Sequence, residues 1–322
     1  MKRMSYAEAG VDIDAEEQAV AGIVSAVGDT EAVHLDGHRL VMCTDGVGSK
    51  VIVADEMRRW DTVGIDCMAM NVNDALCMGA RPLAFVDYLA MEQTDEQKAA
   101  DIARGLRRGA DQAGIPILGG ETATLPEVIR GFDLAGTCVA VVEHELPRDI
   151  RPGDVIIGLR SSGLHSNGYT LARKVFTENG YDYHETLPGT REAIGDALLE
   201  PTRIYVRETL ALWDEIDVRG ISHVTGGGLR NLKRLSSDVC FSIDEPFEPQ
   251  HVFQVVQELG NVADREMYQT FNMGMGLALV VGPADVGSAL DMLARHSDMD
   301  AKIVGHVTEG AGVELPDLEL RY

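Results

Sequence analysis

Apolar and polar residues follow two patterns along this chain, one with the period of a β-strand and one with that of an α-helix. Short apolar runs predict strands at 40–43, 83–89, 134–142, 155–159, 277–281 and 302–307. Helical spacing of apolar residues predicts helices at 14–27, 64–80, 94–106, 169–180 and 285–295. Because strands and helices alternate and polar, Gly-rich sequences follow the strands, we expect an α/β or α+β fold whose loops carry the ligand chemistry.

A chain of 322 residues is long enough for roughly two domains and a sizeable core. The sequence Arg151-Pro152-Gly153-Asp154 predicts a turn, and it is the best candidate boundary. We therefore expect an N-terminal domain at 1–150 and a C-terminal domain at 151–322.

The segment Asp45–Lys50 brings a carboxylate, two glycines, a hydroxyl and a lysine to the end of the predicted strand 40–43. Glycines let backbone N–H groups approach a ligand closely, a carboxylate can hold a hard cation, and a lysine can bind phosphate oxygens. The segment is not a Walker A loop, because Val51 stands where that pattern needs Ser or Thr. The structural alternative is a tight turn with a solvated Asp and Lys.

The predicted helix 64–80 is mostly apolar, and Asp66, Asn71, Asn73 and Asp74 are its polar exceptions. In a helix, Asp66, Asn73 and Asp74 share one face. Carboxylates in an apolar helix are costly unless they are paired or metal-bound, and Mg²⁺ usually binds one or two carboxylates together with substrate phosphates. The pattern therefore favours a magnesium and phosphate site, unless Asn73 or Asp74 only caps a shorter helix.

Two histidines stand beside Gly-rich sequence that precedes a helix. His165 lies with Asn167 just before the predicted helix 169–180, and His223 lies before three glycines and a predicted helix at 229–235. Hydroxyls and glycines ahead of a helix can bind an anion, although Ser166 or Asn167 can equally act as a helix cap. Because both histidines lie in loops, we expect their truncation to alanine to remove little packing.

Composition limits the classes of partner. The chain has 52 acidic and 28 basic residues and a net charge of −24, which argues against nucleic-acid binding through a basic face. Such a halophile-like acidic surface repels itself in dilute buffer and is screened by salt, so we expect a salt-rich cytoplasm, with an acidic mesophilic protein as the alternative. The five scattered cysteines contain no Cys-x-x-Cys pair and indicate buried thiols in a reducing compartment. No apolar run reaches the roughly 20 residues of a membrane span and no secretory signal is visible, so we expect neither membrane nor nucleic-acid partners.

Nine stretches together resemble the phosphoribosylformylglycinamidine cyclo-ligases, also called aminoimidazole ribonucleotide synthetases. They occur in family order at 5–13, 44–50, 64–80, 119–123, 133–142, 153–169, 200–206, 223–229 and 266–274. Ser5–Ile13 and Pro201–Val206 are the stretches most specific to this family, whereas the motifs around Asp45 and Asp74 are shared more widely in its superfamily.

The resemblance implies an ATP-dependent ring closure in purine biosynthesis. ATP would phosphorylate the formamide oxygen of formylglycinamidine ribonucleotide, a substrate nitrogen would attack the activated carbon, and ADP and phosphate would leave 5-aminoimidazole ribonucleotide. Phosphorylation turns a poor leaving group into a good one, so the chemistry needs Mg²⁺ and positioning more than a strong nucleophile. The resemblance also implies a homodimer in which N-terminal mixed sheets form a barrel-like interface, with an α/β C-terminal domain beside it.

The same resemblance implies which residues form the site. The expected metal ligands are Asp45, Asp66, Asp74 and Glu121. The expected nucleotide-binding residues are Asp45, Gly46, Gly48, Ser49, Asn73, Gly120 and Thr122. The expected catalytic residues are Lys50 at phosphate oxygens, and His165, Asn167 and His223 at the substrate and the transferred phosphoryl group.

Two segments, at 29–39 and 124–131, are shorter and poorer in glycine than is usual in the family. We expect this shortening to affect how the loops close over the nucleotide.

Other enzymes of the superfamily are the nearest alternatives for the function. Thiamine-phosphate kinase would lack the Ser5–Ile13 signature, and selenophosphate synthetase would need a reactive cysteine near the N-terminus, where the first cysteine here is Cys43 within a predicted strand. The alternative outside the enzymes is a homologue that binds a nucleotide without catalysing a reaction.

Overall fold

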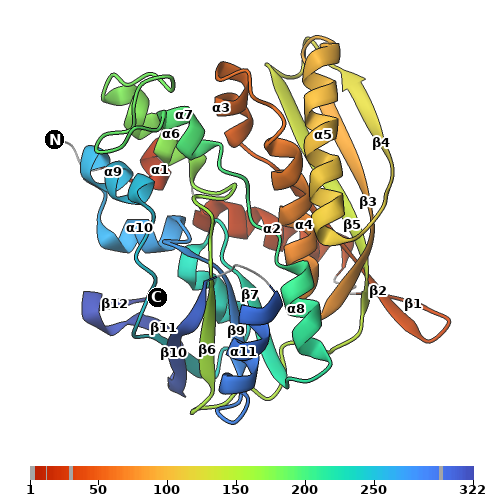
Figure 1. Ribbon diagram of the computed structural model, residues 1–322, viewed down its shortest axis with the longest axis vertical. Coiled ribbons are helices and arrows are strands. Elements are labelled where there is room, and N and C mark those ends of the chain that lie inside the picture. The colour runs from red at the N-terminus through yellow and green to blue at the C-terminus, as the bar shows by residue number, and fades with distance from the viewer. Residues whose placement is uncertain (1–3, 12, 29–31, 297–299) are drawn as a thin grey trace.

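The computed structural model describes residues 4–11, 13–28, 32–296 and 300–322. The chain forms two β-sheets, each packed against helices, and Figure 1 shows them as two neighbouring layered units. All strands of one sheet lie before residue 143, and all strands of the other lie after residue 154. This confirms the predicted mixed α/β fold.

The first sheet has five strands in the order β1-β2-β5-β3-β4. Their bounds are β1 Val33–Leu35, β2 His38–Gly46, β3 Ala80–Met91, β4 Ile117–Thr124 and β5 Phe132–Val142. Neighbouring strands are antiparallel except β3 and β4, which are parallel because a helix connects them. The predicted strand 40–43 is longer than expected, so that Asp45 and Gly46 belong to β2 instead of a loop.

Helices α4 (Val63–Cys77) and α5 (Glu96–Ala113) cover one face of this sheet. They pack closely because Gly64 lies at their crossing, where a Cβ would come within 2.4 Å of the Ile102 carbonyl oxygen. The predicted helix 64–80 ends at Cys77 because β3 already starts at Ala80. In the part of the chain that the structure describes, no helix covers the opposite face of the sheet (Figure 1).

The second sheet has seven strands in the order β12-β11-β8-β10-β6-β9-β7. Their bounds are β6 Val155–Arg160, β7 Val218–His223, β8 Val239–Ile243, β9 Met275–Val281, β10 Ala301–Glu309, β11 Gly312–Leu315 and β12 Leu320–Arg321. Its pairs are antiparallel except β8 and β11. Every residue of β7, β8 and β9 is buried; β8 and β9 are largely apolar, whereas β7 also buries Arg219, Ser222 and His223.

The remaining helices complete the two units. They are α1 Tyr6–Ala9, α2 Ile13–Val27, α3 Lys50–Glu56, α6 Tyr169–Glu178, α7 Ile194–Leu198, α8 Val206–Trp213, α9 His251–Gly260, α10 Asp264–Thr270 and α11 Val286–His296, with 3₁₀ helices η1 Gly228–Arg234 and η2 Pro316–Leu318. The predicted helix 229–235 is therefore a 3₁₀ helix. Within the described residues, no helix is both long and apolar enough to span a bilayer.

The first residues of the chain pack on its second half. Met4 N donates to the Gly260 carbonyl at 3.2 Å, and Tyr6 N donates to Glu266 Oε1 at 2.6 Å. From there α2 runs across the junction between the two units, so both halves and the N-terminal segment border the same space.

Candidate active site

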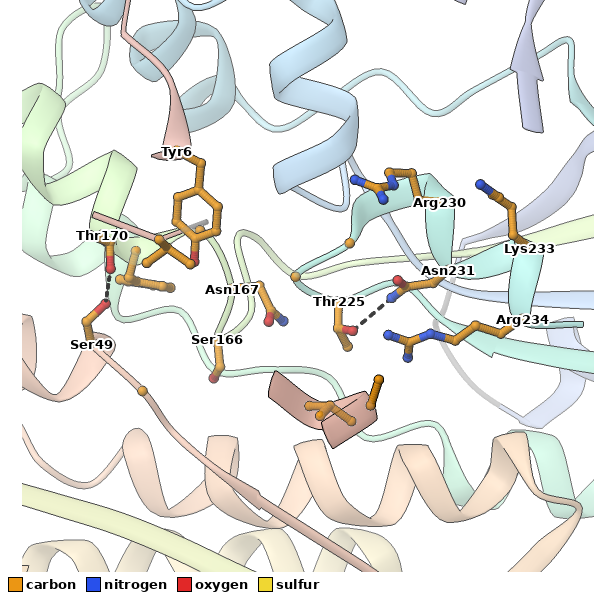
Figure 2. A pocket seen from close by; sticks show the side chains of 18 of the residues that line it. Tyr6, Ser49, Ser166, Asn167, Thr170, Thr225, Arg230, Asn231, Lys233 and Arg234 are labelled. Atoms are coloured by element: carbon orange, nitrogen blue, oxygen red, sulfur yellow. Dashed lines mark hydrogen bonds between the residues drawn. The ribbon is translucent and has the colours of Figure 1, made fainter. Parts of the chain in front are cut away.

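A cavity of about 920 Å³ lies at the junction of the two units. Its walls come from α2, from Gly48 and Ser49 at the start of α3, from residues 166–170, from residues 225–227 and from η1. Figure 2 shows these segments facing one another across the cavity, with Ser49 Oγ 3.1 Å from Thr170 Oγ1. The Gly- and hydroxyl-containing sequences at 48–49, 166–168 and 225–227 therefore meet in one cavity. The second and third follow the first by about 120 and about 180 residues along the chain.

A second cavity of about 330 Å³ shares Asn231 and Arg234 with the first. Asp74 and His223 line it. The ring of His223 is almost fully buried, and its Nδ1 lies 2.8 Å from Asp74 Oδ1. The two candidate residues therefore form a direct pair between α4 of the first unit and β7 of the second.

The hydrogen bonds of Asn73 fix the tautomer of His223. Asn73 Oδ1 accepts from Tyr205 N at 3.0 Å, and Asn73 Nδ2 donates to the Arg203 carbonyl at 2.9 Å. The same amide nitrogen lies 3.4 Å from His223 Nε2, which must then accept. In this arrangement the Nδ1–H of His223 donates to the Asp74 carboxylate.

Asp45 and Asp74 form an acidic pair on the side of β2 that faces α4. Burial and the negative charge of Asp74 raise the pKa of Asp45, against the hydrogen bond from Gly46 N (2.7 Å) and the nearby His223. Asn71 donates to the Asp45 carbonyl oxygen at 3.2 Å, while its own Oδ1 is buried with no hydrogen-bond partner among the described residues. Repelling carboxylates beside a free amide oxygen are a donor set that suits a hard cation.

Lys50 and Asp66 are placed differently from the expectation. Both are fully buried, and the Lys50 ammonium lies 2.9 Å from the Asp66 carboxylate. Lys50 Nζ also donates to the carbonyl oxygens of His165 (3.0 Å) and Glu200 (2.7 Å). An ammonium has three N–H donors, so none is left for a phosphate oxygen in this arrangement.

His165 is buried beneath the cavity and does not line it. Its φ of 63° is left-handed, its Nε2 accepts from Ser162 N at 3.2 Å, and its Nδ1 has no hydrogen-bond partner among the residues described. Burial, reinforced by His223 and Lys50, lowers its pKa well below the usual value, so the ring is neutral. The expectation that truncation of His165 or His223 removes little packing is wrong, because both rings are enclosed by protein.

Asn167 does line the cavity, and its side chain points into it in Figure 2. Its Nδ2 is buried, and no hydrogen bond to it is found in the described part of the chain. An amide donor aimed at an open volume without a partner is a group that a ligand can satisfy.

Glu121 and its neighbours lie elsewhere in the sheet. Glu121 pairs with Tyr88, Tyr88 with Ala135, and Ala135 with Gly46, which puts Glu121 three strands from β2, roughly 14 Å at the usual strand spacing. Its side chain shares the uncovered face with Tyr88, opposite the face of Asp45. Within one chain, the described residues hold no group of three or more His, Cys, Asp and Glu that suits a metal ion, so Asp45, Asp66, Asp74 and Glu121 do not converge. Gly120 and Thr122 lie on the same edge strand.

The structure also brings in basic residues that the sequence analysis did not single out. Arg230, Lys233 and Arg234 project from η1 around the large cavity, as Figure 2 shows. The signal was present: three cations in five residues, directly after a run of three glycines, are unusual in a chain with a net charge of −24.

Two family models match the chain. The N-terminal domain of AIR synthase related proteins matches residues 28–142, and the C-terminal domain of the same proteins matches residues 151–317.

Individual proteins agree with these models. The phosphoribosylformylglycinamidine cyclo-ligase of Methanopyrus kandleri is 52% identical and that of Methanococcoides burtonii 46% identical, and the alignments cover 97% and 99% of both chains in each pair. The solved thiamine monophosphate kinase of Aquifex aeolicus superposes with a TM-score of 0.66 over 95% of this chain and 98% of that one, at 16% identity. At that identity the likeness shows the fold alone.

Proposed function

The chain belongs to the phosphoribosylformylglycinamidine cyclo-ligase family, and we propose that it closes the imidazole ring in the cavity between its two units. It is an ATP-dependent ligase of purine biosynthesis. Thiamine-phosphate kinase, the alternative within the superfamily, is much more distant, at 16% identity against 46% and 52%. The observation that carries the proposal is the Asp74–His223 pair, which links α4 of the first unit to β7 of the second beside two adjoining cavities at their junction, the larger of them Gly-rich and lined by cations.

The larger cavity borders groups that suit both substrates. Formylglycinamidine ribonucleotide would occupy the larger one, where residues 166–168 and 225–227 offer backbone N–H groups and Asn167 offers a free amide donor. The phosphates of ATP would lie toward Gly46, Gly48 and Ser49. His223 and the buried His165 would orient the reacting groups through the hydrogen bonds of their ring nitrogens. Burial lowers the pKa of His165, so its ring is neutral and offers one donor and one acceptor.

Mg²⁺ fits the Asp45–Asp74 pair, on the evidence of their mutual repulsion and of the unpartnered Asn71 oxygen beside them. When bound there, the ion would neutralise phosphate charge. Two protein carboxylates are enough, because Mg²⁺ commonly takes its other ligands from phosphates and water. Asn73, Gly120, Glu121 and Thr122 remain proposed nucleotide-site residues; Asn73 acts on His223, and the other three lie on β4.

The activity is testable directly. With ATP, Mg²⁺ and formylglycinamidine ribonucleotide, the purified protein is expected to release one ADP and one phosphate for each aminoimidazole formed, measured by a coupled ADP assay and by the absorbance of the diazotised product. Without the ribonucleotide, ADP release should fall at least about 100-fold, because the formamide oxygen is the acceptor. Equal ADP release with and without the ribonucleotide, or with thiamine phosphate in its place, would contradict the proposal.

We further propose a homodimer formed through the uncovered face of the first sheet. Large apolar side chains are exposed there, with Met42 on β2 and Leu118 on β4 about 70% accessible and Val86 and Tyr88 of β3 between them. Exposed patches of this kind on a sheet mark interfaces. The opposing acidic surfaces repel, so salt should favour the pairing, and a salt-rich, reducing cytoplasm would suit both the charge of −24 and the five free cysteines.

Met42→Asp is expected to weaken dimerisation at least about 100-fold, because it would bury an unpaired carboxylate in an apolar interface. Sedimentation velocity at 0.05 M and 2 M KCl measures the effect, and the dimer fraction of the unaltered protein should rise with salt. Val128→Asp is the matched control, since Val128 is equally exposed but lies in a loop outside the sheet. A dimer that persists in Met42→Asp at both salt concentrations would exclude this face.

A further inference from the structure

Arg234 is the basic side chain that lies where the two cavities adjoin. It stands in the last turn of η1 and lines both the larger and the smaller cavity. Figure 2 shows the guanidinium of Arg234 directed toward Thr225, whereas Lys233, its neighbour in the chain, is directed elsewhere and lines only the large cavity. Arg234 therefore faces the space of the ribonucleotide and the space of the acidic pair at once.

The guanidinium of Arg234 is available to bind a ligand. Among the described residues no hydrogen bond or ion pair is found for it. Its charge nevertheless reaches the Asp74 side of the site: burial raises the pKa of the Cys77 thiol, the Asp74 carboxylate raises it further, and Arg234 opposes both. Arg234 lines the small cavity together with Asp74, Cys77 and His223, and Cys77 Sγ accepts from His223 N at 3.1 Å. The Arg234 side chain therefore borders the same space as the Asp74–His223 pair.

The transferred phosphoryl group needs a cation at this junction. Charge spreads over its three equatorial oxygens in the transition state, and a correctly placed arginine typically contributes about 10³–10⁵-fold in rate to such transfers. Lys50, the cation expected from the sequence, uses all three of its donors on Asp66, His165 and Glu200. A guanidinium is always charged and presents paired N–H donors that match two phosphoryl oxygens, so Arg234 has the required chemistry.

We propose that Arg234 is a catalytic residue that contacts the phosphoryl group while it passes from ATP to the formamide oxygen. The proposal rests on the proposed function. In this step a lone pair of the formamide oxygen forms a bond to the γ-phosphorus, the bond from that phosphorus to the β,γ-bridging oxygen breaks, and ADP leaves with the electron pair. Arg234 donates to equatorial oxygens throughout and neither gains nor loses a proton.

Single-turnover ADP formation tests this role, together with steady-state kcat and KM. Arg234→Gln is expected to lower kcat and the single-turnover rate at least about 100-fold, with KM for ATP and for the ribonucleotide changed less than about threefold. Arg234→Lys keeps the positive charge but loses the paired, planar N–H donors of the guanidinium, so it should recover only part of the rate. Guanidinium chloride at millimolar concentration should raise the rate of Arg234→Ala, which a purely structural role would not allow. Arg107→Gln is the matched control, since Arg107 is an exposed cation on α5 that lines neither cavity, and it should stay within about threefold of the unaltered protein in every parameter.

Each other outcome is decisive. A normal kcat with a raised KM for the ribonucleotide would overturn the proposal by making Arg234 a ground-state ligand of the substrate. Equal losses of rate in Arg234→Gln and Arg107→Gln would overturn the proposal, because the effect would then come from the change in net charge and not from a contact with the phosphoryl group. If the unaltered protein shows no ribonucleotide-dependent ADP formation, the proposed function is wrong, and the catalytic role of Arg234 is excluded together with it.

Discussion

Asp66→Ala is expected to lower the free energy of unfolding by about 3–5 kcal/mol, because it leaves the Lys50 ammonium buried without its counter-charge. Neither side chain has any exposed surface, so water cannot replace the lost carboxylate. The variant also removes the acceptor of Thr202 N (2.7 Å) and Thr202 Oγ1 (2.6 Å). Urea unfolding followed by circular dichroism measures the change, with the slope checked for two-state behaviour.

The loss should be felt at the junction of the two units. Lys50 and Asp66 belong to the first unit, whereas the groups they hold, at His165, Glu200 and Thr202, belong to the second. Through the His165 carbonyl the same pair fixes the left-handed turn that carries the buried imidazole. Turnover should therefore fall in Asp66→Ala even below the denaturation midpoint, without any metal contact being involved.

The exposed pair Arg107–Asp111 on α5 is the matched control. Its partners are 2.9 Å apart, and both are well exposed, so Asp111→Ala should change stability by less than about 1 kcal/mol. The double variant Lys50→Met/Asp66→Leu should regain part of the stability, because it leaves no buried charge behind. If Asp66→Ala is as stable as Asp111→Ala but needs far more Mg²⁺ for turnover, the metal role expected from the sequence is correct and the structural role is not.

Lys50 shows why sequence alone placed the elements better than the site. The apolar run before Asp45 and the mixed polarity of helix 64–80 are local, and local patterns predicted β2 and α4 within a few residues. A lysine after a Gly-rich turn looks the same whether it meets a phosphate or a buried carboxylate. The choice is made by His165 and Glu200, which lie 115 and 150 residues away along the chain.

Glu121 illustrates the second limit. A glutamate at the end of an apolar run suggests a ligand, but its neighbours depend on strand order. Because β5 and β3 lie between β2 and β4, Glu121 and Asp45 are on separate strands and opposite faces. The two histidine loops were more informative, since glycines and hydroxyls before a helix predict an exposed polar loop wherever the helix packs, and residues 166–168 and 225–227 do line one cavity.

His223→Ala is expected to lower kcat about 100-fold or more, and Asp74→Asn to lower kcat and raise the Mg²⁺ concentration needed for half-maximal rate. His223, at the end of β7 in the second unit, contacts two candidate residues on α4 of the first unit, through Nδ1 to Asp74 and through Nε2 to Asn73. Asp74→Asn keeps an oxygen near Nδ1 but removes the charge that pairs with Asp45. Initial rates at saturating ATP and ribonucleotide, over a Mg²⁺ titration, give both parameters.

Packing and chemistry can be separated in this test, because His223 is buried and alanine would leave a cavity in its place. His223→Gln fills most of that volume, and its amide can satisfy either Asp74 or Asn73 but cannot take up and release a proton. If His223→Gln restores the melting temperature while kcat stays about 100-fold low, the imidazole acts in the reaction. His251→Ala on α9 is the control, since that histidine is exposed and bonded to the Pro188 carbonyl, and its rate should stay within about twofold of the unaltered protein. Recovery of both stability and rate in His223→Gln would instead show that His223 has only a structural role between the units. Catalysis would then depend on Asp74 and the side chains of the large cavity.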